Sequence, residues 1–172
     1  MTYPEIVILA TLMSRVRHGY EIKKRAEIIF GDTYTLNNNT LYTNLRRFQE
    51  MGAVECEVMH VPGKPDRHVY SITEKGREIF REMVLDFTPE MAKNDMEFYS
   101  RVAFFHLLEP AERERITSVR KDVLKERLER YSDLRGACAS HKRIYDEKVV
   151  QFLGEQAKNE LQWVVSLESV PE

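Results

Sequence analysis

Residues 37–52, with the sequence N-N-N-T-L-Y-T-N-L-R-R-F-Q-E-M-G, predict a short helix with a defined start, one apolar face and a defined end. Asn37 suits the N-cap position because its side-chain oxygen can accept a hydrogen bond from an unpaired amide of the first turn. Gly52 follows the last turn, where a residue in the left-handed conformation is least strained as glycine. Three apolar residues recur at helical spacing and should face a core: Leu41, Leu45 and Phe48.

The opposite face of this helix carries hydrogen-bonding and basic side chains. A rotation of about 100° per residue places there Asn39, Tyr42, Thr43 and Arg46, with Arg47 at the edge. Such a face suits the major groove of DNA, but an ordinary solvent-exposed helix has the same pattern. The neighbouring segments must decide between these two interpretations.

Two further helices are predicted before residue 37. Thr2 to Glu5 has the capping-box pattern T-x-x-E, with Pro4 near the first helical position, and predicts a helix to about residue 14. After a polar break at residues 14–19, a second helix is predicted from about Gly19 to Phe30, with basic residues on its outer side. Three short helices with tight connections, the third with a polar face, form a helix-turn-helix pattern.

A β-hairpin is predicted directly after the third helix. Residues 53–61 and 68–72 alternate between apolar and polar side chains, and the turn P-G-K-P-D separates them. A hairpin in this place is a wing, and its basic residues suit phosphates or a minor groove. Tyr20 and Tyr70 are both expected in the core or at its edge rather than in contact with DNA. Thr73 then caps a fourth helix that continues to about Phe87.

The remaining residues predict long helices. Thr88-Pro89 predicts the start of a helix that contains Phe98 and extends to Leu107, and further helices are predicted over about 110–135 and 140–167 with a break at Gly136-Ala137. Their apolar stripes cannot all be buried within one chain of this size. We therefore expect these helices to pack against a second chain.

Composition excludes several classes of protein. The chain has 172 residues, of which 42% are hydrophobic and 31% charged, and no apolar run approaches the roughly 18 residues that span a bilayer. The N-terminus lacks the pattern of a signal peptide, and the two cysteines, Cys56 and Cys138, have no metal or redox spacing, so a cytoplasmic protein is expected. Residues 1–82 contain 12 Lys/Arg and 11 Asp/Glu, so DNA binding must depend on local placement of charge.

Three motifs occur in a fixed order: H-G-Y-E-I-K-K-R (18–25), T-L-Y-T-N-L-R-R-F-Q-E-M-G-A-V-E (40–55) and R-H-V-Y-S-I-T-E-K-G-R-E-I-F (67–80). Together they resemble the PadR family of bacterial transcriptional regulators over nearly all of the first 85 residues. The segment Q-A-K-N-E-L-Q-W-V-V (156–165) resembles, more loosely, the longer subfamily with an extended helical C-terminal domain. The resemblance implies a dimeric winged-helix repressor that can respond to small aromatic molecules.

The expected fold class is therefore mainly α with a small β-hairpin. Residues 1–85 should form a winged helix-turn-helix DNA-binding domain, and residues 86–172 an all-helical dimerisation and possible effector domain. The expected function is sequence-specific binding of a palindromic operator in double-stranded DNA by a homodimeric repressor, released by a small aromatic effector. The alternative is a winged-helix protein-interaction module with a helical assembly scaffold and no DNA binding, which the nearly neutral charge of residues 1–82 favours.

Asparagine suits adenine and arginine suits guanine in the major groove, so base contacts are predicted from Asn38, Asn39, Thr43 and Arg46. Phosphate contacts are predicted from residues of the second and third helices, namely Tyr20, Lys23, Lys24, Tyr42 and Arg47. Contacts from the wing are predicted from Lys64, Arg67 and His68. The complete set of predicted DNA-binding residues is Tyr20, Lys23, Lys24, Asn38, Asn39, Thr40, Tyr42, Thr43, Arg46, Arg47, Lys64, Arg67 and His68.

The candidate residues for dimerisation or effector binding are Phe98, Tyr99, Tyr131, Phe152, Leu161 and Trp163. These side chains either line an effector pocket or simply fill a helix–helix interface. The five histidines show no metal-binding spacing, and no catalytic motif or phosphate-binding glycine loop occurs. We therefore expect no enzyme activity, no metal, no cofactor and no membrane partner.

Overall fold

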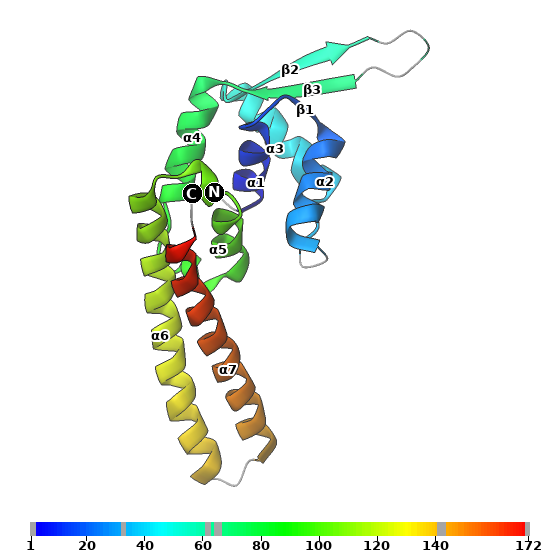
Figure 1. Cartoon of the computed structure of the whole chain (residues 1–172). Helices are drawn as coiled ribbons and strands as arrows, with labels where there is room; N and C mark the ends of the chain where they lie inside the picture. The colour runs from blue at the N-terminus through cyan, green and yellow to red at the C-terminus, as the bar shows by residue number, and fades with distance from the viewer. Residues whose placement is uncertain (1–2, 32–33, 61–62, 64–66, 141–143, 171–172) are drawn as a thin grey trace. The chain divides into compact units, whose positions relative to one another are not determined.

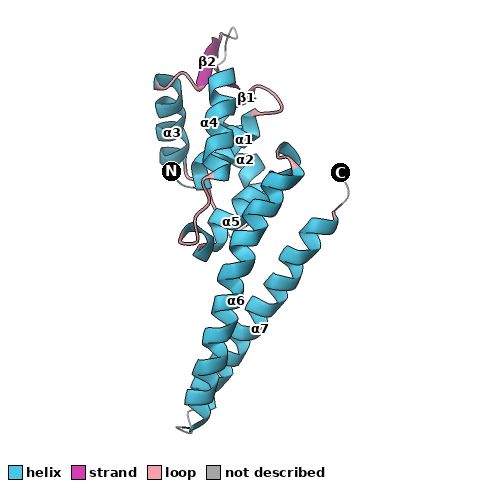
Figure 2. Ribbon diagram, turned by 90° about the vertical axis from the view of Figure 1, so that its left-hand side faces the viewer, coloured by secondary structure: helices cyan, strands magenta, loops and turns pink. Residues whose placement is uncertain are grey.

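The computed structural model describes residues 3–31, 34–60, 63, 67–140 and 144–170. The chain divides into two compact units: unit 1 is Met1–Asp86 with Tyr99–Phe105, and unit 2 is Phe87–Phe98 with His106–Glu172. The described elements are mostly helical and include one small antiparallel sheet (Figure 2). The predicted fold class is confirmed.

Unit 1 contains four helices and a small sheet among its described residues (Figure 1): α1 (Tyr3–Leu12), β1 (Arg17–His18), α2 (Gly19–Phe30), α3 (Asn38–Glu50), β2 (Val54–Met59), β3 (Arg67–Ile72) and α4 (Glu74–Leu85). Helix α1 is apolar on nearly all sides, and Ile6, Val7, Ile8 and Leu9 are at most 1% exposed. Burial of apolar surface is the main favourable term in folding, so α1 is the centre of this core.

The sheet contains one strand more than the sequence predicted. Its order is β1-β3-β2, and both pairings are antiparallel. Strands β2 and β3 form the predicted hairpin, with Cys56 opposite Tyr70. The predicted polar break at residues 14–19 contains the missed strand, in which Arg17 pairs with Tyr70 and His18 with Val69. A strand of two residues is too short to show any alternation of polarity.

Helix α3 begins and ends as the sequence predicts. The side chain of Asn37 accepts a hydrogen bond of 2.8 Å from the Thr40 amide, and Gly52 has the left-handed φ of 71°. The three predicted core residues, Leu41, Leu45 and Phe48, are at most 1% exposed. Because these three side chains are anchored in the core, the opposite face of α3 points toward solvent.

The hydroxyl of Thr73 joins the start of α4 to the turn after α3. It accepts from the Gly76 amide at 3.0 Å and donates to the Gly52 carbonyl at 2.8 Å. Gly76 lies directly against the Ala53 carbonyl, and an ideal Cβ placed there would also lie 2.7 Å from Ile72 Cγ1. Only glycine fits at this crossing, so α4 holds the end of α3 and the base of the hairpin together.

Arg101 closes the other end of α4. Its side chain is fully buried and donates to the carbonyls of Met83, Val84 and Asp86 at 3.1–3.2 Å. These carbonyls belong to the last turn of a helix or come just after it, where no backbone amide is available within the helix. The segment Tyr99–Phe105 is therefore bonded into unit 1 although it lies more than a dozen residues beyond α4.

Unit 2 and the segment that crosses between the units contain η2 (Met91–Lys93), α5 (Asp95–Val102), η3 (Phe105–Leu107), α6 (Pro110–Ser140), α7 (Ile144–Ser166) and η4 (Leu167–Ser169). The single helix predicted from Thr88 to Leu107 is wrong. Asn94 ends η2 and starts α5, because its side chain accepts from the Met96 amide at 2.9 Å. The break predicted at Gly136 is also wrong, because α6 continues to Ser140. Among the described residues, no helix has the length and apolar character needed to cross a membrane.

Arg120 joins three elements of unit 2 from a fully buried position on α6. Its guanidinium donates to the carbonyl of Ala92, to Asp95 Oδ1 at 2.6 Å, and to Glu160 Oε1 at 2.8 Å through Nε. The same guanidinium lies 5.3 Å from the ring centroid of Phe98. Burial lowers the pKa of Arg120, but the carboxylates of Asp95 and Glu160 raise it by more, so the net shift is upward. A buried charge with this many partners fixes α6 and α7 against the turn before α5.

Candidate nucleic-acid interface

The outer face of α3 exposes all four side chains for which base contacts are predicted. Asn38, Asn39, Thr43 and Arg46 are exposed, and their side chains have no hydrogen-bond or ion-pair partner within the described part of the chain. Thr40, which directly follows Asn39 on the helix, is half-buried. Polar groups on a rigid helix that are not already paired are available to a ligand, so this face is the candidate reading surface.

Arg47 differs from its neighbour Arg46. Its guanidinium donates to Glu5 of α1, whose side chain is only 6% exposed, and lies 5.3 Å from the Phe48 ring centroid. Arg47 Nε is buried without a hydrogen-bond partner among the described residues. Arg47 is thus committed to packing inside unit 1, and its predicted phosphate contact stays a prediction.

Tyr42 occupies the middle of the outer face of α3 and is 49% exposed. The other side of its ring lies against the first residue of α2, because an ideal Cβ at Gly19 would be 2.8 Å from Tyr42 Oη and 3.1 Å from Tyr42 Cε1. The structure therefore brings α3 and the start of α2 together at a contact that only glycine permits without a shift of the ring.

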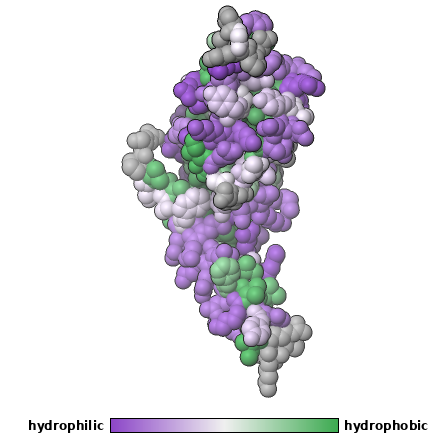
Figure 3. Space-filling model, turned by 90° about the vertical axis from the view of Figure 1, so that its right-hand side faces the viewer, coloured by the Kyte–Doolittle hydropathy of each residue, from purple (hydrophilic) through white to green (hydrophobic). Residues whose placement is uncertain are grey.

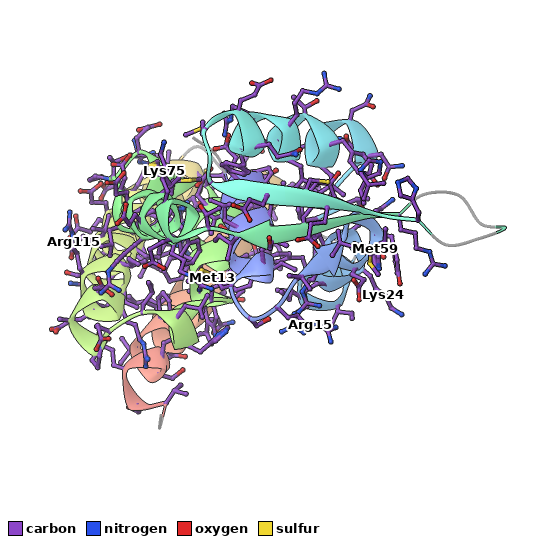
Figure 4. The ribbon with its side chains drawn as sticks, turned by 90° about the horizontal axis from the view of Figure 1, so that it is seen from above. Met13, Arg15, Lys24, Met59, Lys75 and Arg115 are labelled. Carbon is purple, nitrogen blue, oxygen red and sulfur yellow. The ribbon has the colours of Figure 1, made fainter. Side chains whose placement is uncertain are left out.

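The predicted α2 residues lie near the same contact. Tyr20 is 65% exposed, so its predicted place in the core or at its edge is wrong; its ring stacks on His18 with a centroid distance of 5.7 Å. Lys23 is half-buried and Lys24 is exposed. Viewed from above, Lys24 and α3 lie on opposite sides of the hairpin (Figure 4).

Sequence reasoning omitted three arginines beside this group. Arg15 is exposed and lies 3.8 Å from Glu21, and Arg25 is exposed at the end of the basic run that also contains Lys23 and Lys24. Arg17 donates to the Thr11 carbonyl at 2.8 Å, and burial together with the charge of Arg15 lowers the pKa of Arg17. The continuous run of basic residues was the available signal for Arg25; Arg15 and Arg17 lie in the segment predicted as a polar break.

The wing presents Arg67 and His68 as exposed residues, whereas the predicted contact Lys64 lies outside the described residues. His68 Nδ1 lies 3.5 Å from Cys56 Sγ, and the His68 carbonyl is 3.2 Å from His18 Nδ1. Tyr70 is 6% exposed, as predicted, and burial raises its pKa to about 12, with Cys56 and Tyr42 acting in the same direction.

One face of the wing carries carboxylates beside Arg67, because Arg67 lies opposite Met59 and so shares a face with Glu55 and Glu57. Glu55 and Glu57 are exposed on β2, and the alternation of a strand directs both to the side opposite Cys56. Carboxylates repel DNA phosphates, so this face suits the DNA backbone only at its Arg67 end. The sequence showed these residues but gave them no role.

The candidate dimerisation and effector residues are only partly brought together. Phe98 and Trp163 meet edge to face with a centroid distance of 5.9 Å, and Phe87 stacks on Phe98. Tyr131 packs over Gly154, and Leu161 is half-buried. Phe152 lies apart from this pair on the surface of α7, and Tyr99 belongs to unit 1.

An apolar surface covers the region of α6 and α7 near their connection. Its exposed fractions are 44% for Leu134, 67% for Ile144, 86% for Tyr145, 58% for Val149 and 57% for Phe152. Figure 3 shows hydrophobic side chains gathered on the helical hairpin next to the grey residues. In the described residues, no group of three or more His, Cys, Asp or Glu could hold a metal ion.

Residues 8–82 match the model of the transcriptional regulator PadR-like family. A probable transcriptional regulator of Mycobacterium tuberculosis is 30% identical over 70 residues, which are 41% of this chain and 37% of that protein. The chain thus matches little more than a third of the length of this curated relative.

Two solved structures are also similar. Bacillus subtilis PadR in complex with operator DNA is 19% identical, with a TM-score of 0.49 and coverage of 98% of this chain and 97% of that one. A transcriptional regulator from Clostridium thermocellum is 26% identical, with a TM-score of 0.42 and coverage of 45% and 75%.

Proposed function

We propose that this protein is a sequence-specific DNA-binding regulator that acts as a homodimeric repressor, since residues 8–82 match the model of the transcriptional regulator PadR-like family. The observation that carries the proposal is the outer face of α3. Asn38, Asn39, Thr43 and Arg46 are exposed there with no partner among the described residues, while the opposite face is anchored in the core. In this proposal α3 enters the major groove and these four side chains contact base edges.

Local charge supports contact with the DNA backbone although residues 1–82 are nearly neutral. Lys23, Lys24 and Arg67 have no ion-pair or hydrogen-bond partner in the part of the chain that the structure describes, and neither has Arg46. Cations that are already paired within the protein neutralise phosphates poorly, whereas unpaired ones can displace counterions. Because Glu55 and Glu57 make the outer face of β2 acidic, the wing contacts DNA through its basic residues rather than along this strand.

Dimerisation through residues 86–172 accounts for the apolar surface near the end of the helical hairpin. Tyr145, Val149 and Phe152 succeed one another at spacings of four and three residues, which is the pattern of a helix seam that packs on another helix. A second copy of the chain is the proposed occupant. Two recognition helices would then address half-sites about one helical turn, or roughly 34 Å, apart.

A small aromatic effector is the third part of the proposal, and the pair Phe98–Trp163 is its best candidate site. An effector that favours one spacing of the two DNA-binding domains over another would release DNA by a shift of population. The simpler interpretation is that these rings only fill the contact between helices. Trp163 fluorescence against a panel of phenolic and cationic aromatic compounds separates the two, and no response across the panel removes the effector from the proposal.

DNA binding is tested by anisotropy titrations of a palindromic fragment taken from directly upstream of the coding region. With four phosphates neutralised per chain, the slope of log K against log salt should be about −7 for the dimer, from about −0.9 per phosphate. Arg46→Ala should weaken binding and relax sequence preference at one position of each half-site. A flat salt dependence, with no retention on any duplex at low salt, would instead favour a protein-interaction module.

The homodimer is tested separately by light scattering after size-exclusion chromatography. Phe152→Glu places a charge in the proposed seam and should yield monomers. Lys158→Glu is the control because residue 158 is exposed on the same helix and, at about 100° per residue, lies about 120° around the helix from Phe152. A wild-type chain that is monomeric at all concentrations would remove dimerisation while leaving the DNA-binding proposal intact.

A further inference from the structure

The contact between Gly19 and Tyr42 restricts the position of Tyr42 on the outer face of α3, and the sequence does not reveal this contact. Gly19 is the first residue of α2 and is buried, and a Cβ at this position would lie 2.8 Å from the phenol oxygen of Tyr42. The Cε1 and Cζ atoms of the same ring would be 3.1 Å away. The ring thus fills the space that any other residue at position 19 would occupy.

Tyr42 has a second neighbour on the sheet. Burial raises the pKa of Tyr70 of β3, and Cys56 and Tyr42 act in the same direction. One side of the Tyr42 ring is covered by the start of α2, while 49% of the residue remains exposed. Contact with the start of α2 holds one side of the ring, and a group added at position 19 would displace the ring.

Tyr42 also stands at the centre of the candidate reading surface. Asn38 and Asn39 lie one turn before it on α3, Thr43 comes directly after it, and Arg46 lies one turn beyond it. A small rotation or shift of α3 at Tyr42 would displace all four side chains together. Hydrogen bonds to base edges require donor–acceptor distances of about 2.7–3.2 Å, so displacements of even about 1 Å remove them.

We propose that Tyr42 is a specificity-determining positioning residue, which acts through its ring on Gly19 rather than through a hydroxyl contact to phosphate. The Gly19–Tyr42 contact sets where the exposed face of α3 stands relative to α2 and the wing. This inference rests on the proposed DNA-binding function and adds to it the residue that fixes the geometry of readout.

The two close glycines of unit 1 distinguish positioning from folding. A Cβ at Gly76 would collide with the backbone of Ala53, which cannot move without unfolding the crossing. A Cβ at Gly19 would meet only the far end of a side chain, which can swing away. Alanine also favours a helix more than glycine does. Gly19→Ala should therefore leave the melting temperature equal to or above that of the wild type while displacing Tyr42.

The experiment compares the affinity of the full chain for the operator fragment and for a shuffled duplex of the same composition. Gly19→Ala and Tyr42→Ala should each reduce the operator-to-shuffled affinity ratio by about tenfold, the loss expected for one good base contact. Tyr42→Phe keeps the ring and should retain the ratio to within about threefold. The double variant Gly19→Ala/Tyr42→Ala should be no worse than Tyr42→Ala, because the added methyl then meets nothing. Gly136→Ala, with no heavy atom near its Cβ, is the control.

Each alternative outcome overturns a definite statement. If Tyr42→Phe loses as much as Tyr42→Ala, and both duplexes lose equally, Tyr42 is a phosphate contact and the inference is wrong. If Gly19→Ala has the wild-type ratio, or if the losses in the double variant add, the two residues are not coupled and the inference is wrong. If the wild type binds neither duplex, the proposed function fails and the inference fails with it.

Discussion

Arg47 of α3 donates to the carboxylate of Glu5 in α1, whereas Arg46, its neighbour in sequence, has no hydrogen-bond or ion-pair partner among the described residues. The two arginines are identical in chemistry and differ in direction by one helical step. One therefore stabilises the fold, and the other is available for a ligand.

This difference predicts opposite results for the two alanine variants. Arg47→Ala should lower the free energy of unfolding by about 1–3 kcal/mol, because it removes the partner of a carboxylate that is largely buried. Arg46→Ala should change it by less than about 0.5 kcal/mol, as is usual for an exposed residue. Urea unfolding measures both. Equal losses for the two variants would contradict the assignment of Arg47 to the α1–α3 contact.

Gly76→Ala should be strongly destabilising, by about 3 kcal/mol, because the new methyl group meets the Ala53 carbonyl and the Ile72 side chain at the start of α4. Gly136→Ala is its counterpart on α6, where nothing lies within 4 Å of the added Cβ. That variant should gain about 0.5–1 kcal/mol, since alanine restricts the unfolded chain and favours the helix. Thermal unfolding of the two variants side by side checks the prediction, which fails if their shifts have the same sign.

Alkaline pH should destabilise the fold through Tyr70. Burial raises the pKa of Tyr70 to about 12, against about 10 for the unfolded chain. Its contribution to stability is therefore complete below about pH 10 and is lost as the pH rises toward 12, by up to about 1.4 kcal/mol per pH unit. Tyr70→Phe should flatten this part of the stability profile. The ionisation is followed by the ultraviolet absorbance of tyrosinate. A Tyr70→Phe variant that loses stability at alkaline pH as steeply as the wild type would contradict the prediction.

Arg120→Met should cost about 3–5 kcal/mol, because it leaves Glu160 and the Ala92 carbonyl without their shared donor in a buried site. Lys125→Met is the matched control on the same helix, because Lys125 pairs with Asp122 at an exposed position. Its cost should be below about 1 kcal/mol. Denaturant titrations give both values. Trp163 fluorescence should also change in Arg120→Met, since Arg120 and Trp163 both pack on Phe98.

Much of unit 1 results from local chemistry that a sequence displays. The caps at Asn37 and Thr73 bond to amides three residues away, and the sequence between β2 and β3 is one short run rich in proline and glycine. The three inward residues of α3 are given by helical spacing alone. Where two interacting residues lie within one or two helical turns of each other, their types and spacing were sufficient to predict the contact.

Contacts between distant residues were not predictable in the same way. Arg47 lies 42 residues from Glu5, and Arg120 lies 40 residues from Glu160. Nothing in the local pattern distinguishes these arginines from exposed ones. The failed break at Gly136 has a related cause: a single glycine costs about 1 kcal/mol in a helix, and burial of the rest of α6 against α7 outweighs it.

The three carbonyls that Arg101 satisfies at the end of α4 have a consequence for gene fusion and recombination. A winged helix that is complete by residue 86 could be exchanged between proteins by a single crossover after α4. Here such a chimera would lose Arg101 and leave the end of α4 without a donor. An exchange that preserves the DNA-binding unit would have to carry the chain through Phe105, so that the winged helix and the segment from Phe87 to Phe105 are inherited as one piece.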